Sequence, residues 1–417
     1  MTPPRPKPGA AGWRNADDLR GLGQLAVEGV TGVTDLVEAM HAAITHLPSA
    51  IGRPAPAATT GVPGFVYRNI RGVARLVGSG IDRSLGALAP ALGAGSRSSQ
   101  REAALAIING VLGDHLEASG NPLAIQMQIR RDGVGLQPAA GVLGADLPEA
   151  SGKLLVQVHG LCMSDLQWTL RGHDHGRSLA KDLGYARVHL NYNTGRHVSA
   201  NGADFARLLE ELIDAWPVPV EELVLLCHSM GGLVARSALD HAESSGLGWA
   251  RLPTRLVFLG TPHHGAPLER AGSWVDTLVG LTPYSLPLAR LGKLRSAGIQ
   301  DLRHGNLHGP HGHDSEGDPR LDRRKPMPLP PHVLAYAIAA STGPAPVAGG
   351  NRATRGDGLV PIASALGQHR RPAFDLRIPR ARRWVGYGIG HLEMLGDAGV
   401  YRRIHRWLRA PVDSAQP

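Results

Sequence analysis

A serine between a strand pattern and a helix pattern is the feature that most constrains the fold of this chain. The apolar run from Leu223 to Leu226 predicts a buried strand, which leads through Cys227 and His228 into Ser229. Two glycines follow, and apolar residues then recur at helical spacing. Such a turn needs small neighbours because its backbone is strained. The pattern predicts a serine at the apex of the turn, beside helix N-terminal N–H groups that favour a developing negative charge.

A second strand pattern, residues 153–158, ends in a His-Gly pair about seventy residues before that serine. In α/β-hydrolases the loop after the third strand donates one N–H group of an oxyanion hole, and the residue after the nucleophile donates the other. We therefore predict Leu161 and Met230 as the oxyanion donors, with Cys162 as the alternative to Leu161. Gly160 is expected to permit a close approach of the backbone to the substrate.

The candidate acid and base follow the serine in the order Ser, Asp, His that the α/β-hydrolase fold uses. Asp357 lies in a tight Gly-Asp-Gly loop, where a buried carboxylate can orient an imidazole and stabilise its protonated form. His391 follows 34 residues later (391 − 357), in a glycine-rich loop after a strand pattern. His369 is nearer to Asp357 but lies in a basic run typical of an exposed loop. We predict Ser229 as the nucleophile, Asp357 as the acid and His391 as the base.

These motifs resemble those of the lipases related to GPI inositol-deacylase. The resemblance covers roughly residues 120 to 410, and one of its segments, Thr261-Pro262-His263-His264-Gly265, is also similar to bacterial triacylglycerol lipases and lecithin–cholesterol acyltransferase-like enzymes. It implies a serine esterase with the same nucleophile, acid, base and oxyanion donors. Ester hydrolysis by these residues requires no cofactor.

Strand patterns alternate with helix patterns from residue 121 onward. This alternation predicts an α/β-hydrolase fold with a mostly parallel sheet and helices on both faces. We expect residues 1–16 to be a disordered tail, residues 17–120 to form an N-terminal helical region, and residues 121–417 to form the hydrolase domain. The helical region carries three apolar stripes, around 30–47, 66–88 and 105–116, which predict either a layer packed on the core or a surface that contacts lipid or a partner protein.

Residues 266–330 form a long insertion between two strand patterns, which we interpret as a lid. An apolar helix pattern around Trp274 is suited to covering an acyl chain. The insertion also carries imidazoles and carboxylates, and His173-Asp174-His175 is a second such group. The intervening glycines and prolines favour a polar loop over a metal site, so we predict no bound metal. The residues concerned in the insertion are His304, His308, His311, His313, Asp314 and Asp318.

Composition excludes several classes. The chain has 417 residues and a formal net charge of +9, but its arginines are scattered without an aromatic-interleaved stripe, which argues against nucleic-acid binding. The two cysteines, Cys162 and Cys227, cannot form a disulfide framework and lack metal-ligand spacing. No run of 18 apolar residues and no secretory leader pattern is visible, so we expect a cytoplasmic protein.

The sequence leaves three functions open. Hydrolysis of a lipid or other acyl ester is the leading hypothesis, because all four catalytic elements occur in order. Acyl transfer to an alcohol would use the same residues with a different acceptor. A non-catalytic, hydrolase-like scaffold that binds lipid or a partner through the N-terminal helices is the third.

Overall fold

The structure is a computed structural model that describes residues 17–18, 20–28, 68, 71–72, 79, 99–139, 142–147, 149–266, 296–308, 324–345 and 356–410. The chain divides into two compact units. One comprises residues 1–101 and 116–124, and the other comprises residues 102–115 and 125–417. In the first unit residues 20–28 are helical, Arg101 forms an ion pair with Asp18, and the Asn121 side chain donates to the backbone oxygen of Gly21.

An eight-stranded sheet forms the second unit, in the order β2-β1-β4-β3-β5-β6-β7-β8. All neighbouring pairs from β4 to β8 are parallel, whereas β1 is antiparallel to both β2 and β4. The predicted mostly parallel sheet is thus confirmed. The strands are β1 (Gln128–Arg131), β2 (Val134–Gly135), β3 (Lys153–Val158), β4 (Ala186–Asn191), β5 (Glu222–His228), β6 (Thr254–Leu259), β7 (Leu334–Ser341) and β8 (Arg383–Tyr387).

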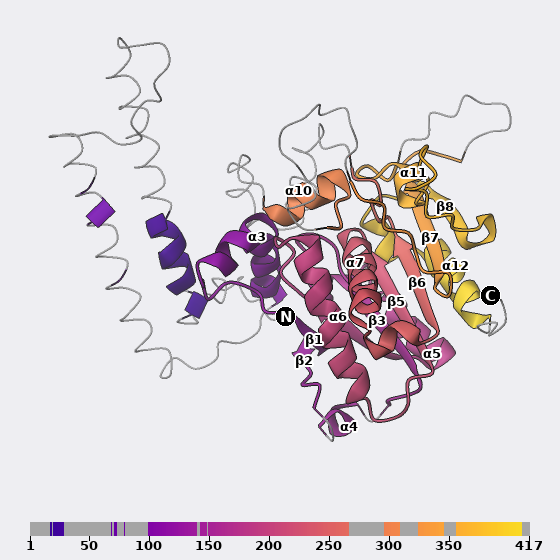
Figure 1. The fold of residues 1–417 in the computed structure, drawn as a ribbon, viewed down its shortest axis with the longest axis horizontal. Coiled ribbons are helices and arrows are strands. Elements are labelled where there is room, and N and C mark those ends of the chain that lie inside the picture. Colours follow the sequence, from indigo (N-terminus) through magenta and orange to yellow (C-terminus); the bar gives the residue numbers. More distant parts are fainter. Residues whose placement is uncertain are drawn as a thin grey trace, which may run out of the picture. The chain divides into compact units, whose positions relative to one another are not determined.

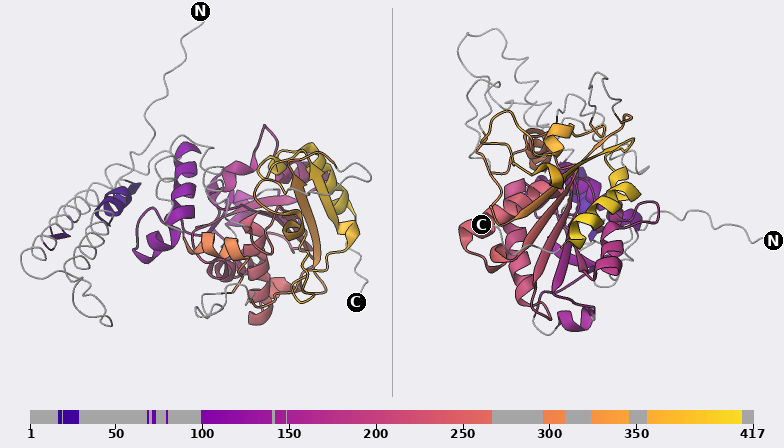
Figure 2. Two further views of the ribbon diagram at one scale, coloured as in Figure 1. Left: turned by 90° about the horizontal axis from the view of Figure 1, so that it is seen from above. Right: turned by 90° about the vertical axis from the view of Figure 1, so that its right-hand side faces the viewer.

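Helices cover both faces of this sheet (Figures 1 and 2). One face packs against α6 and α7, and the other packs against α5 and α12. The central strands are buried on both faces, which explains their nearly continuous apolar sequences. The helices of this unit are residues 102–115 of α3 (Ser99–Ala118), α4 (Leu143–Asp146), α5 (His175–Leu183), α6 (Val198–Asp214), α7 (Met230–Ser245), α10 (Ala297–His304), α11 (Ile362–Ala365) and α12 (Ala398–Arg409).

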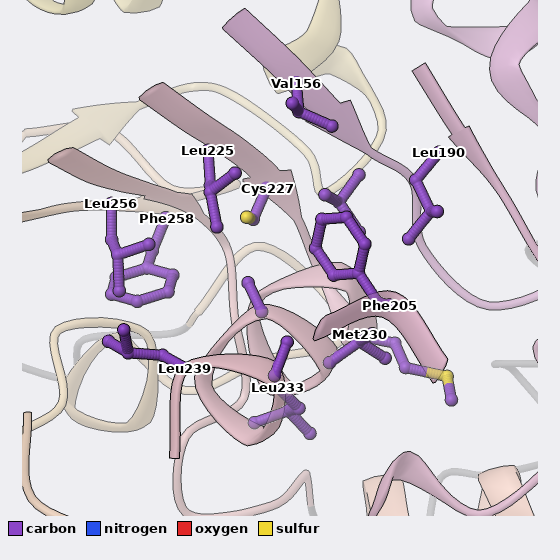
Figure 3. Close-up of a cluster of buried hydrophobic side chains, with 14 of the residues drawn as sticks. Val156, Leu190, Phe205, Leu225, Cys227, Met230, Leu233, Leu239, Leu256 and Phe258 are labelled. Carbon is purple, nitrogen blue, oxygen red and sulfur yellow. The ribbon is translucent and has the colours of Figure 1, made fainter. Parts of the chain in front are cut away.

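The core under α7 places the start of that helix firmly against the strands. Figure 3 shows Leu233 and Leu239 of α7 and Phe205 of α6 directed towards side chains of β5 and β6. Two glycines let the elements approach closely, because a Cβ at Gly231 would overlap the Val158 oxygen and a Cβ at Gly232 would overlap the Thr261 hydroxyl. The turn between β5 and α7 is therefore fixed from two sides.

A buried arginine closes the C-terminal end of α12. Arg255 on β6 is 1% exposed, and its guanidinium donates to the backbone oxygens of Trp407, Leu408 and Ala410. Glu222 on β5 lies 3.2 Å from the same guanidinium. These contacts satisfy carbonyl groups that a helix end leaves without partners, and they place a cation at the negative end of the helix dipole.

The N-terminal helical region is described only in part. The expected stripes around 30–47 and 66–88 lie almost wholly outside the described residues, as does the expected tail 1–16. The third stripe lies in α3, but residues 104–111 are buried on all sides of that helix rather than along one stripe. Residues 102–115 belong to the compact unit that contains the sheet, which differs from the boundary expected at residue 120.

The insertion between β6 and β7 contributes α10 to the described structure. Residues 267–295, with the apolar helix pattern around Trp274, and residues 309–323, with four of the six candidate metal ligands, lie outside the described residues. Within the residues that the structure describes, no helix is long and apolar enough to cross a membrane.

Candidate active site

Ser229 stands in the strained turn that its sequence predicts. It lies between β5 and α7, with φ 53° and ψ −124°, a conformation that residues with side chains rarely adopt. Its hydroxyl has no hydrogen-bond partner among the described residues, and the residue is 2% exposed. Such strain persists only where the surrounding structure holds it, and it is common at catalytic sites.

Asp357 and His391 meet although they lie 34 residues apart. The His391 Nδ1 atom is 2.7 Å from the Asp357 Oδ2 atom, and both side chains are buried. The other carboxylate oxygen accepts from the backbone N–H groups of Leu359 and Val360, at 2.9 and 2.7 Å. The His391 N–H group donates to the Asp357 backbone oxygen, which fixes the loop that carries the imidazole. The predicted acid and base are thus neighbours.

Opposing effects act on the Asp357 carboxyl group. Burial alone would raise its pKa, but the adjacent His391 imidazole and the hydrogen bonds from His391, Val360 and Leu359 outweigh this and lower the pKa below its usual value. The group is therefore ionised at neutral pH. An ionised acceptor at this position holds the imidazole with Nδ1 protonated, so that its Nε2 atom is the basic one.

His228 connects the serine turn to the His391 loop. Its Nε2 atom lies 3.1 Å from the His391 backbone oxygen, and the two rings have centroids 4.8 Å apart. Burial, followed by the charge of His391, lowers the pKa of His228 to about 3, so its ring is neutral. The sequence reasoning assigned no role to this residue, although its place directly before the serine was a signal that it would face the site.

The loop directly after β3, residues 159–162, carries the candidate donor Leu161 and is called the oxyanion loop. It approaches the serine at Gly160. A Cβ at that position would lie 3.0 Å from the Ser229 Cβ and 3.1 Å from the His228 Nδ1, so glycine here lets the loop lie against the serine turn. Leu161 follows in a buried position. The Cys162 N–H group donates to the Thr194 hydroxyl at 3.1 Å, so the Leu161 N–H group remains the candidate donor. Met230 is the first residue of α7, whose initial N–H groups have no partners within the helix.

Neither cysteine is placed to react as a thiolate. Both are buried, and burial raises the pKa of the Cys162 thiol to about 12 and raises that of Cys227 further. Among the described residues no group of three or more histidine, cysteine or acidic side chains is arranged to hold a metal ion. In the second predicted group Asp174 caps α5, and His175 bonds to the Met394 backbone oxygen and to His173.

Residues 149–282 match the family model described as a PGAP1-like alpha/beta domain. The strand order, the strained serine turn and this match agree with the fold expected from the sequence. The domain has the α/β-hydrolase fold. The expected resemblance to the lipases and esterases of this fold is confirmed. No curated protein matches the chain in sequence.

Solved structures similar to this domain are esterases and a thioesterase. The NocB thioesterase domain from the nocardicin cluster is 16% identical, with a TM-score of 0.33, over 63% of this chain and 96% of that domain. An esterase from Pyrococcus furiosus is 15% identical, with a TM-score of 0.35, over 63% of this chain and 82% of its own. The Pyrobaculum calidifontis esterase is 16% identical, with a TM-score of 0.32, over 62% of this chain and 77% of its own.

Buried histidines around the site make stability depend on pH. Burial lowers the pKa of His159 and His175 to about 4 and that of His228 to about 3, against 6.5 for an unfolded chain. Between those values the unfolded chain binds more protons than the folded one, so stability must fall as the pH falls from 6.5 towards 4. Each such histidine contributes up to about 1.4 kcal/mol per pH unit in that window.

We therefore expect the free energy of unfolding to decrease steeply from pH 6.5 to 4.5. In His175→Gln, whose amide can still donate to the Met394 oxygen, the slope should be shallower by about 1 kcal/mol per pH unit. Denaturant titrations at several pH values measure this, with His241→Gln on the outer part of α7 as the control. Equal slopes in the wild type and His175→Gln would contradict the expectation.

Proposed function

We propose that this protein is a serine carboxylic-ester hydrolase that acts on acyl esters through Ser229, His391 and Asp357. The observation that carries the proposal is the buried, 2.7 Å contact between Asp357 and His391, on a loop that packs against the strained serine turn. This is the arrangement of nucleophile, base and orienting acid that acyl transfer requires. The PGAP1-like match over residues 149–282 supports the same class of chemistry.

The proposed reaction has two halves. The Ser229 oxygen attacks the ester carbonyl carbon while its proton passes to the His391 Nε2 atom, and the Leu161 and Met230 N–H groups donate to the resulting oxyanion. The intermediate collapses, the imidazolium returns the proton to the departing alcohol, and an acyl-serine ester remains. Water, deprotonated by His391, then attacks that ester, and the acid product leaves as the serine regains its proton. Asp357 stays ionised throughout.

Acyl chains are the proposed substrate class because of the insertion between β6 and β7. Its sequence carries an apolar helix pattern around Trp274, and such insertions lie over the active site in this fold. The oxyanion loop and α7 add buried apolar side chains at Leu161 and Met230. An apolar surround favours a hydrocarbon acyl group over a small polar ester.

A chain-length series of p-nitrophenyl esters, from acetate to palmitate, tests the proposal. We expect hydrolysis with kcat/KM rising from acetate towards longer chains. A simple alcohol added to the same assay would reveal acyl transfer as a new ester product. Absence of hydrolysis and of transfer across the whole series, in folded protein, would overturn the proposed function.

A further inference from the structure

The oxyanion loop contains a second strained residue. Cys162, directly after the candidate donor Leu161, has φ 58°, although it is not glycine. Its N–H group donates to the Thr194 hydroxyl at 3.1 Å, across 32 residues of sequence. Thr194 itself is 1% exposed, in the loop after β4. A left-handed residue persists only where its surroundings hold it, and the threonine hydroxyl provides one such hold.

Helix α3 packs against the same cysteine. This helix precedes the strands of the sheet and is an addition to the hydrolase fold. A Cβ at Gly110 would overlap the Cys162 sulfur and would lie 3.1 Å from its Cα. Glycine is unfavourable within a helix, so its place in the middle of α3 has a packing reason here. The Asn193 amide also donates to the Gly113 backbone oxygen at 2.8 Å. Helix α3 therefore supports both Cys162 and the loop that carries Thr194.

Helix α10 encloses that loop from another side. The Gly298 N–H group donates to the Gly195 backbone oxygen at 3.0 Å, and a Cβ at Gly298 would overlap the backbone oxygen of Thr194. The Ser296 hydroxyl at the start of α10 donates to the Gly110 oxygen at 2.7 Å. Helix α10 thus contacts both α3 and the loop after β4, and these two in turn contact Cys162 of the oxyanion loop.

We infer that Thr194, held between α3 and α10, is a positioning residue that fixes the oxyanion loop and so sets the strength of transition-state binding. Its hydroxyl fixes the Leu161–Cys162 peptide, and that peptide determines where the preceding Leu161 N–H group points. This inference rests on the proposed function, because an oxyanion donor matters only if acyl chemistry occurs at Ser229. Loosening the loop should weaken binding of the tetrahedral state far more than binding of the substrate.

Thr194→Val and Thr194→Ser form the matched pair that tests this role. Valine keeps the shape of threonine but leaves the Cys162 N–H group without its acceptor, whereas serine retains the hydroxyl. With a p-nitrophenyl ester we expect kcat of Thr194→Val to fall about 10- to 100-fold with KM changed less than about twofold. Thr194→Ser should stay within about threefold of the wild type. The inhibition constant of an alkyl trifluoromethyl ketone, which forms a tetrahedral adduct with a serine, should rise in Thr194→Val in parallel with the loss of kcat.

A second pair of variants tests the contact from α3. Gly110→Ala should lower kcat because the new Cβ displaces Cys162, and adding Cys162→Gly should restore much of it, because glycine removes the overlapping atoms and accepts a positive φ. Gly144→Ala, where a Cβ would meet nothing within 4 Å, is the control.

These measurements distinguish a failure of the Thr194 positioning role from a failure of the proposed esterase function. An active wild type with Thr194→Val unchanged, or with KM rising instead of kcat falling, would overturn the positioning role alone. A wild type that neither hydrolyses nor transfers any ester would overturn the proposed function and the inference together. If Gly110→Ala does not fold, the Thr194 pair still decides.

Discussion

Ser229→Ala is expected to reduce ester hydrolysis by about five to six orders of magnitude, because the acyl-enzyme can no longer form. The remaining activity would come from the oxyanion donors and substrate binding acting on water. Stability should change little, since the Ser229 hydroxyl has no hydrogen-bond partner among the described residues. Alanine keeps the Cβ that the turn already accommodates, so the strained backbone should survive. Initial rates with a p-nitrophenyl ester, measured beside a thermal melt, give both quantities.

Ser244→Ala is the matched control for that change. Ser244 lies on the same helix, α7, but near its C-terminal end and exposed to solvent. It should retain full activity. Ser229→Ala protein that is folded and keeps more than about a tenth of the wild-type rate would show that another group is the nucleophile.

Asp357→Asn is expected to lower kcat by about four orders of magnitude near neutral pH. The asparagine oxygen can still accept from the Leu359 and Val360 N–H groups, but its amide N–H₂ would then face the His391 Nδ1 atom, which in the wild type donates its proton to the Asp357 carboxylate. If Nδ1 kept its proton, two N–H donors would face each other, so the imidazole must carry its proton on Nε2 instead. In that tautomer it cannot take the serine proton. KM should change little, because the substrate does not contact Asp357 in the proposed mechanism.

Asp375→Asn supplies the control for this substitution. Asp375 also accepts backbone N–H groups, from His369 and Arg377, but lies outside the candidate site. Its replacement should leave kcat within about twofold of the wild type. A folded Asp357→Asn enzyme with nearly normal kcat would mean that the contact between Asp357 and His391 is structural.

Much of the central sheet could be predicted from the sequence because its strands are buried on both faces. The expected strand at 153–158 matches β3, and the apolar run from Arg255 to Leu259 predicts a strand that starts one residue after β6 does. The apolar spacing between Gly202 and Trp216 predicts a helix over those residues, but α6 runs from Val198 to Asp214. That glycine is a packing residue, since a Cβ there would overlap the Ser237 hydroxyl on α7.

The catalytic residues were predictable because the fold requires them in a set order along the chain. The contacts between loops and helices that support the oxyanion loop were not. The pairing of Asp357 with His391 follows from where loops leave neighbouring strands of a hydrolase sheet. Thr194 gave a weaker signal: it follows β4, which neighbours β3, so its loop had to come near the oxyanion loop. The contact of Gly110 with Cys162 could not be anticipated, because it depends on how α3 packs against a loop 52 residues away (162 − 110).

Covalent labelling tests the central claim most directly. The folded protein would be treated with an alkyl fluorophosphonate, digested, and mapped by mass spectrometry, with Ser229→Ala and Asp357→Asn treated in parallel. The account predicts one adduct, on the peptide that contains Ser229, with labelling abolished in Ser229→Ala and much slower in Asp357→Asn. A protein that resists labelling while folded, or an adduct on another residue that persists in Ser229→Ala, would contradict it.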